Sequence, residues 1–435
     1  MIHLRSIRIS GLLMLGLAAG PLRGQSHPAA DSAAAARTSW QAAAEAFRDG
    51  DSQTAWQRAL LASHQWPEQV EYQRGVAIAA ARRRDPTSLI AALDRLTSFQ
   101  AGGGMARDSS VAALRDRPAV ARALGRLAQA SAPIRRSTVA ATIEDSTLFA
   151  EGLDADAATG TLYVASVHHR TIYAIGRDGR PRDLQLTRHQ RIGAILGVRF
   201  DAARGVLWAT TAGLAQGAGF APADSSIAAL LRIRPADGEL LGRWDLPAGL
   251  PHVAGDLAIG PRGDVFVTDS RSPWLYQLAP GADTLIGRTD PLFRSLQGPA
   301  PSPDGRTLYL ADYSHGLLRL DLASGVTSRL AVPAGVTSLG VDGLILAGGA
   351  LIGVQNGVSP ARIVRFTLDG AGRRIVSAVT VDRHLPEADQ PTIGTLLGKD
   401  YLYVANSQWD QYNDDGTRVP GRALGRTLIL KLRIP

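Results

Sequence analysis

The feature that most constrains this chain is an alternation of short apolar runs and tight turns that begins after Arg136. One copy can be read in full over residues 298–332, with strands at 298–303, 307–311, 317–322 and 327–332 and turns at 304–305, 315–316 and 324–325. Runs of this length, rich in Val, Leu, Tyr and Thr between Gly- and Asp-containing turns, are typical of antiparallel strands. Each copy therefore predicts a small four-stranded antiparallel sheet.

The same unit recurs along the chain to its end. Its copies start at Glu151, Gly197, Asp256, Gln297, Asp342 and Thr392. Six four-stranded units of this kind predict an all-β, six-bladed β-propeller over residues 137–435. We expect residues 137–143 to pair with residues 427–434 in one blade, because a ring closed by strands from both ends of the domain hides its edges.

A helical pattern precedes the strands, over residues 38–132. Apolar residues from Trp40 onward follow helical spacing, and Gly and Asp separate successive helices. Matching residues stand 34 positions apart at Ala43 and Ala77, Asp51 and Asp85, and Ala59 and Leu93. This period resembles the tetratricopeptide repeat, although any alanine-rich array of helical hairpins gives a similar pattern. The sequence predicts a small all-α domain, with a degenerate third unit at 109–130.

The first 24 residues have the character of a secretory signal peptide. Arg5 and Arg8 precede an apolar stretch at 11–20, and Gly24 offers a small residue for cleavage. A stretch of about ten apolar residues is too short for a bilayer, which needs roughly 20. Leu22 is an imperfect residue for a cleavage site, so retention of an uncleaved segment stays open. We expect a leader over residues 25–37, no transmembrane span, and a periplasmic or extracellular location.

Charge and composition exclude several classes of function. Lys and Arg number 47 against 39 Asp and Glu, and nearly all of the cations are arginines. Because these arginines are scattered and do not form one stripe, we expect no nucleic-acid partner. The chain has no cysteine, which removes disulfides, thiolate metal sites and cysteine nucleophiles. It also has no Gly-x-Ser-x-Gly segment of the α/β-hydrolase type.

Polar residues at the blade starts should meet at the propeller axis, because the first strand of each blade lines the central channel. Glu151, Asp256, Gln297 and Asp342 occupy such positions. Carboxylate and amide oxygens are hard ligands that suit Ca²⁺, Mg²⁺ or Mn²⁺. The four residues are therefore candidate metal ligands. The alternative, which weighs most for Asp256, is that these side chains cap turns or accept hydrogen bonds from backbone amides.

Short motifs around these positions are shared with one known family. They are Glu151-Gly152, Gly255-Asp256, Gln297-Gly298 followed by Ser302-Pro303-Asp304-Gly305, and Asp342-Gly343. Over residues 139–435 they resemble the family of senescence marker protein, gluconolactonase and luciferin-regenerating enzyme. The resemblance implies a divalent metal held by Glu151, Gln297 and Asp342, with Asp342 as the catalytic base. The implied ion is Ca²⁺, with Mg²⁺, Mn²⁺ or Zn²⁺ as alternatives.

The chain also departs from this family. Gln297 and Gly255 each stand where the family has an asparagine, and no tryptophan follows Glu151-Gly152. Gln297 keeps an amide oxygen but adds a methylene, whereas Gly255 has no side chain. These changes put the family's catalytic chemistry in doubt more than its binding of an ion.

Loops after the second strands hold further candidates. His168, His169, His252 and His315 lie in such loops or near a blade start, although an exposed loop histidine is the default interpretation. Long inserts at 213–220 and 406–421 lengthen the second and sixth blades, and Trp409 could rim a ligand pocket. A solvent-facing insert is the alternative.

Two classes of function follow. The first is a metal-dependent hydrolase of lactones or related esters, with a small lactone or carbohydrate-like molecule as substrate. The second is a non-catalytic scaffold, in which the propeller and the helices recognise proteins or carbohydrates and the helical region has a protein partner. The fold alone does not separate them, because propellers host many functions.

Overall fold

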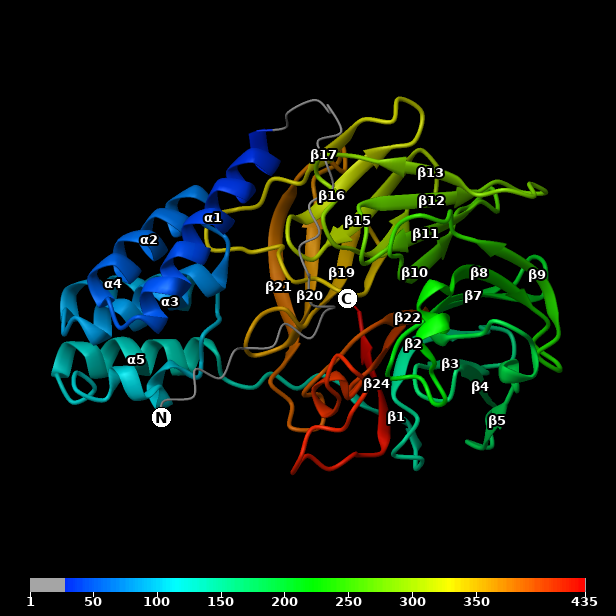
Figure 1. Ribbon diagram of the computed structural model, residues 1–435, viewed down its shortest axis with the longest axis horizontal. Helices are drawn as coiled ribbons and strands as arrows, with labels where there is room; N and C mark the ends of the chain where they lie inside the picture. Colours follow the sequence, from blue (N-terminus) through cyan, green and yellow to red (C-terminus); the bar gives the residue numbers. More distant parts are fainter. Residues whose placement is uncertain (1–27, 435) are drawn as a thin grey trace.

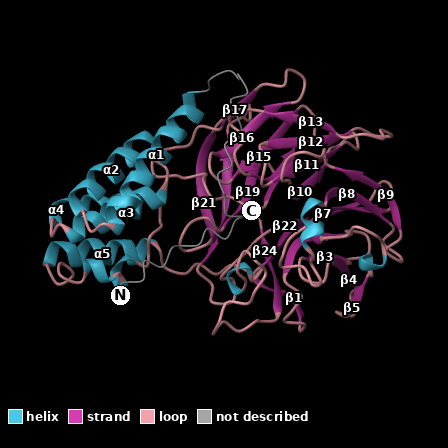
Figure 2. Ribbon diagram, viewed as in Figure 1, coloured by secondary structure: helices cyan, strands magenta, loops and turns pink. Residues whose placement is uncertain are grey.

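The computed structural model describes residues 28–434. In this range an array of α-helices lies beside a ring of six small antiparallel sheets (Figures 1 and 2). The predicted fold class, a small all-α domain followed by a six-bladed β-propeller, is confirmed. The predicted signal peptide at 1–24 lies outside the described residues. Among the described helices, none is both long and apolar enough to cross a membrane.

The helical domain places its helices in chain order, each against the next. They are α1 (Pro28–Arg48), α2 (Ser52–Gln65), α3 (Val70–Arg82), α4 (Pro86–Ser98) and α5 (Pro118–Ala130), with short 3₁₀ turns η1 (Met105–Arg107) and η2 (Ser109–Val111) before α5. Helix α1 corrects one expectation, since residues from Pro28 onward in the predicted leader 25–37 are helical. The reason is tertiary packing: Ala33 and Ala36 are buried against Trp66 and the propeller residue Leu339.

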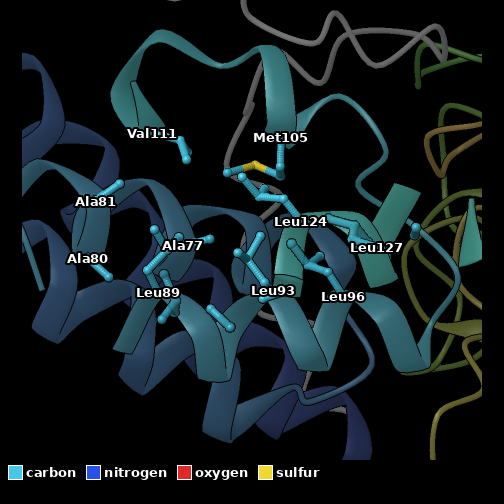
Figure 3. Packing of buried hydrophobic residues seen from close by; sticks show 14 of the residues in the cluster. Ala77, Ala80, Ala81, Leu89, Leu93, Leu96, Met105, Val111, Leu124 and Leu127 are labelled. Atoms are coloured by element: carbon cyan, nitrogen blue, oxygen red, sulfur yellow. The ribbon is translucent and has the colours of Figure 1, made fainter. Parts of the chain in front are cut away.

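The 34-residue period is visible in the structure. Asp51 and Asp85 are the N-caps of α2 and α4, where each carboxylate accepts hydrogen bonds from two backbone amides of the first turn. The other matched positions, Ala43, Ala59, Ala77 and Leu93, are fully buried in one apolar core, part of which is drawn in Figure 3. The third unit is degenerate, because η1 and η2 stand in place of a first long helix.

The propeller blades follow one another along the chain. Blade 1 contains β2 (Ala150–Ala155), β3 (Leu162–Ser166), β4 (Thr171–Ile175) and β5 (Pro181–Asp183), and blade 2 contains β6 (Ala194–Asp201), β7 (Val206–Ala212), β8 (Ala228–Ile233) and β9 (Leu240–Asp245). Blade 3 contains β10 (Ala254–Ile259), β11 (Val265–Asp269), β12 (Trp274–Leu278) and β13 (Ile286–Thr289), and blade 4 contains β14 (Leu296–Pro301), β15 (Thr307–Asp312), β16 (Gly316–Asp321) and β17 (Thr327–Arg329). Blade 5 contains β18 (Leu344–Ala347), β19 (Ala350–Gln355), β20 (Arg362–Leu368) and β21 (Ile375–Arg383).

Blade 6 closes the ring with strands from both ends of the domain. It contains β22 (Gly394–Leu397), β23 (Asp400–Val404), β24 (Thr427–Arg433) and, outermost, β1 (Thr138–Ile143). Strand β1 pairs antiparallel with β24, with Thr138 opposite Lys431 and Ile143 opposite Thr427. The predicted closure is confirmed. The innermost strands contact one another in a closed series, β2, β6, β10, β14, β18, β22 and back to β2.

Glycines lie where neighbouring innermost strands touch. An added Cβ on Gly152 would lie 2.2 Å from the carbonyl oxygen of Leu196, and one on Gly298 would lie 2.4 Å from the amide nitrogen of Leu344. Both separations are shorter than any Cβ tolerates, so a side chain at either position would push two blades apart. Both glycines lie in a β-bulge, because the pairing register shifts between Ala150 and Leu153 in β2 and between Leu296 and Pro299 in β14. A bulge breaks the alternation of side chains and re-aims the residue before each glycine. The Glu-Gly and Gln-Gly motifs thus follow from packing.

Polar contacts of the buried Arg362 and the half-buried Arg329 fix the helical domain on blades 4 and 5. The Arg362 guanidinium donates to the carbonyl of Phe99 in the helical domain (2.8 Å) and to Oε1 of Gln355 (2.6 Å). Arg329 forms an ion pair with Glu68 and stacks over the Trp66 ring, 4.7 Å from its centroid. These contacts join the two domains into one body.

The first prediction concerns Arg362. Arg362→Met should lower the free energy of unfolding by about 2 kcal/mol, because the Phe99 carbonyl and the Gln355 amide lose their buried donor. Arg373→Met, on an exposed turn of the same blade, should leave stability within about 0.5 kcal/mol of the parent. Urea unfolding followed by circular dichroism measures both. Equal midpoints for the Arg362 variant and the parent would contradict the anchoring role.

Candidate functional site

A pocket of about 650 Å³, counting space open to solvent, lies at one end of the central channel. Each blade contributes to it at or just before the amino end of its innermost strand, through Glu151, Leu196, Gly255, Gln297, Asp342 and Ile393 in blade order. The predicted candidates Glu151, Asp256, Gln297 and Asp342 all line this pocket. Within the described part of the chain, no lysine, arginine or histidine lines it.

Two carboxylates of the pocket are joined by one hydroxyl group. The Thr392 hydroxyl lies 2.9 Å from Oε1 of Glu151 and 3.2 Å from Oδ2 of Asp342. Trp409 Nε1 donates to the other oxygen of Glu151 at 2.7 Å, and Asn356 Nδ2 donates to Oδ2 of Asp342 at 2.8 Å. All of these partners are neutral. Both donors to Asp342 use Oδ2, so its Oδ1 receives no side-chain hydrogen bond from the described residues.

Burial governs the charge of this pair. Loss of solvent raises the pKa of the Glu151 carboxyl, and the nearby charge of Asp342 raises it further. Burial also raises the pKa of Asp342, while the hydrogen bonds from Asn356 and Thr392 oppose that shift. Two buried acids without a cationic partner repel each other when both are ionised. A bound cation, or a proton, relieves that repulsion.

Gln297 belongs to a polar wall formed by blades 3 and 4. Its Oε1 accepts from the Ser270 hydroxyl (3.2 Å), and its Nε2 donates to the Ser295 hydroxyl (3.3 Å). The glycine at 255 has a structural reason, because an added Cβ there would lie 2.1 Å from the Ser270 oxygen. The Ser270 hydroxyl thus lies where a side chain at 255 would begin. Gln297 keeps one lone pair of Oε1 for a ligand.

Asp256 differs from the other two acids because it has a cationic partner. Its Oδ2 lies 3.2 Å from Arg199, and its Oδ1 accepts from the Leu257 amide at 2.7 Å. Burial raises the pKa of Asp256, and the Arg199 charge opposes the shift. The same arginine acts on the buried carboxyl of Asp154. Asp256 therefore has the environment of a structural acid, the alternative role considered for it from the sequence.

The two long inserts meet beside the pocket. Gln216 of the blade 2 insert donates to the carbonyl oxygen of Asn413 in the blade 6 insert (3.0 Å). Trp409, at the base of the blade 6 insert, lines the pocket and packs edge-on against Phe149, with ring centroids 4.8 Å apart. Trp409 thus lies at the pocket, and its indole N–H also orients Glu151.

The four candidate histidines form contacts outside the pocket. His168 bonds the carbonyl of Gln216 through Nδ1 (2.8 Å), and His169 contacts Tyr173 and Thr147. His252 pairs with Asp269 beneath its own loop. His315 bonds the Leu292 carbonyl and Arg37 of the helical domain, so it belongs to the domain interface.

Sequence reasoning missed three polar residues of the pocket, namely Ser270, Ser295 and Tyr313. Ser270 and Tyr313 directly follow the aspartates that end β11 and β15. Asp312 accepts hydrogen bonds from the Ser295 amide (2.9 Å) and from its own turn, so it holds both sides of the blade 4 loop. The repeated Asp at the end of a second strand was the available signal, since the residue after it faces the channel end.

The donor set fits a hard divalent cation. Glu151 and Asp342 supply carboxylate oxygens, and Gln297 supplies an amide oxygen. Oxygen ligands of this kind suit Ca²⁺ or Mg²⁺. Over residues 28–434, no cluster of three or more acidic, histidine or cysteine side chains suited to a metal is present. Neutral oxygens would therefore have to complete the coordination.

Comparisons with known proteins give distant structural neighbours. No family model matches the sequence, and no curated protein matches it. A virginiamycin B lyase from Staphylococcus aureus is 14% identical, with 68% of this chain and 98% of the neighbour covered at a TM-score of 0.46. The calcium-binding protein regucalcin from Agrobacterium tumefaciens is 17% identical, with 68% and 93% covered at a TM-score of 0.46. A gluconolactonase from Xanthomonas campestris is 17% identical, with 70% and 95% covered at a TM-score of 0.45.

The second prediction tests the structural role of Asp256. Arg199→Met should lower the free energy of unfolding by about 3 kcal/mol, because it leaves the Asp256 carboxylate buried without a cation. Adding Asp256→Asn to that variant should recover part of the loss, since the uncompensated charge is removed. Denaturant unfolding of the two single variants and the double variant measures the coupling. Effects that simply add, within about 0.5 kcal/mol, would show that the pair is not coupled.

Proposed function

We propose that this chain is an exported, divalent-metal-dependent hydrolase of small neutral lactones or related esters. The observation that carries the proposal is the buried pair Glu151 and Asp342, which opens into a pocket and has only neutral hydrogen-bond partners. Acids kept only for stability are expected to have a cationic partner, as Asp256 has, or to accept hydrogen bonds from backbone amides, as Asp312 does. Neither kind of partner is found for Glu151 and Asp342 among the described residues. An unpaired acid pair at a pocket favours a catalytic or binding role.

The pocket chemistry supports a neutral substrate. No cationic side chain of the described residues lines the pocket, and the two carboxylates of Glu151 and Asp342 would balance the charge of a bound divalent ion. The charge of a carboxylate or phosphate ligand would therefore be left without compensation. The lining combines the apolar side chains Leu196, Val253 and Ile393 with hydroxyl and amide groups of blades 3 and 4. A lining of apolar side chains with a few neutral polar groups suits a lactone ring that carries hydroxyl groups.

Glu151, Asp342 and Gln297 would hold the cation. When bound, a divalent ion draws electron density from a substrate carbonyl and so assists attack on it. Asp342 acts as the base through Oδ1, the oxygen that no described side chain occupies. It takes a proton from water, whose oxygen bonds to the carbonyl carbon. The ester C–O bond then breaks, and the leaving oxygen receives that proton.

Asn356 and Thr392 keep Asp342 in place for this step. Both bind its Oδ2, so the carboxylate plane is fixed while Oδ1 stays open to the pocket. Trp409 does the same for Glu151. Orientation of this kind lowers the entropic cost of bringing base and substrate together.

The third prediction concerns the acid pair. Glu151→Gln and Asp342→Asn should each abolish stoichiometric binding of a divalent ion, and each should lower the rate of glucono-δ-lactone opening by roughly 100-fold or more. The exposed glutamate variant Glu144→Gln is the matched control and should change neither. Metal analysis of the purified proteins and a pH-stat assay give the two readouts.

Thermal unfolding separates loss of the site from loss of the fold. Added Ca²⁺ should raise the unfolding temperature of the parent but not of the two acid variants, which should remain folded because the blades are held by apolar contacts. Unchanged metal content in both variants would refute the metal site. A parent that binds the ion but opens no lactone or ester would favour the non-catalytic binding module instead.

Export forms part of the proposal and has a separate test. The basic start and short apolar stretch of residues 1–24 are typical of a signal peptide. Amino-terminal sequencing of the mature protein should therefore begin close to residue 25. Protein that starts at Met1 and is confined to the cytoplasm would contradict export.

A further inference from the structure

Tyr313 is the polar pocket residue that remains unexplained. Among the described residues, every other polar side chain of the pocket has a hydrogen-bond or ion-pair partner, as given above for the acids, Gln297, the serines and Trp409. No described residue bonds the Tyr313 hydroxyl, although the ring is largely buried and lines the pocket. An unpaired phenol hydroxyl at a pocket is free to donate a hydrogen bond to a bound ligand.

The ring of Tyr313 has little freedom to move away. Its amide donates to the Ser295 carbonyl, and its carbonyl accepts from the Gly340 amide, both at 2.9 Å. The end of the ring lies against Gly357, where an added Cβ would meet both the hydroxyl oxygen and the ring carbon that bears it at 2.8 Å. Only glycine at 357 leaves room for this orientation. The backbone hydrogen bonds thus fix the position of Tyr313, and the lack of a side chain at Gly357 leaves space for its hydroxyl at the pocket.

The helical domain packs against the two segments that hold Tyr313, those around Gly340 and Gly357. Leu339, next to Gly340, packs among Ala33, Ala36 and Trp66 of the helices. Val358, next to Gly357, lies within the main apolar core of the helical domain. Leu339 and Val358 are therefore both packed against the helical domain. This gives the tyrosine a rigid setting, as precise placement of a catalytic donor requires.

We propose that Tyr313 donates a hydrogen bond to the carbonyl oxygen of the bound lactone or ester, and that docking of the helical domain holds it there. The inference rests on the proposed function and adds a catalytic residue to it. As the water oxygen bonds to the carbonyl carbon, the π electrons of the carbonyl move onto its oxygen. The phenol stabilises that charge and keeps its proton, while Asp342 takes the proton of the water.

The test uses Tyr313→Phe in the full-length protein, which keeps the ring and removes only the hydroxyl. Tyr163→Phe is the matched control. Tyr163 belongs to blade 1 and stacks on Phe200 of blade 2, away from the pocket. Its hydroxyl takes part in no hydrogen bond among the described residues. Two readouts are measured: kcat and KM for glucono-δ-lactone opening, and the affinity for glucono-δ-lactam, which keeps a carbonyl oxygen. Thermal unfolding reports whether the variants stay folded.

Tyr313→Phe should lower kcat by about 100-fold with a smaller change in KM, because the hydrogen bond is strongest in the transition state. It should weaken lactam binding by roughly two- to tenfold. The Tyr163 variant should match the parent in both. A parent that binds the lactam without opening the lactone, with weaker binding in Tyr313→Phe, would overturn the hydrolase but support the donor role.

Other outcomes overturn the role of Tyr313. Equal kcat and equal lactam affinity in the folded Tyr313 variant and the parent would show that the phenol does not touch the ligand, while the hydrolase function would stand. A parent that neither opens the lactone nor binds the lactam would overturn both proposals. A loss of kcat that Tyr163→Phe shares would assign the effect to general loosening of the propeller.

Discussion

The close approach of the innermost strands is the constraint on which the rest of the structure depends. At Gly152 and Gly298 the neighbouring backbone lies so near that no Cβ fits. Closure of six blades into one ring requires this approach. Each glycine belongs to a β-bulge that also contains the residue before it, and the two bulges bring Glu151 and Gln297 to the pocket. The motif that closes the ring is therefore also the motif that builds the pocket.

Charge pairing then divides the acids of the channel into two groups. Asp256 is buried next to Arg199, and its charge is matched inside the protein. Glu151 and Asp342 are also buried, but the described residues that bind them are all neutral. Their mutual repulsion must therefore be relieved by a bound cation or a proton. This difference, rather than burial as such, supports our proposal that the second pair is the functional one.

The helical domain takes part in the same architecture. It docks through Arg362 and Arg329, and its core includes Val358, which belongs to the propeller. Side chains from the two domains therefore share one apolar cluster. Through Val358 and Leu339 the helices also pack against the segments next to Gly357 and Gly340, which contact Tyr313.

Much of this structure follows from local sequence patterns. The turn and strand repeat predicts the blades and the pairing of β1 with β24, and the residues before glycines place Glu151 and Gln297 at the pocket, because these features depend on strand geometry and close packing. Tertiary structure alone decided the rest. The start of α1 depends on packing against Leu339, and the role of Asp256 depends on Arg199 from the neighbouring blade. The aspartate before Tyr313 signals that this residue reaches the end of the channel, but the room for its hydroxyl depends on Gly357, which is distant in sequence.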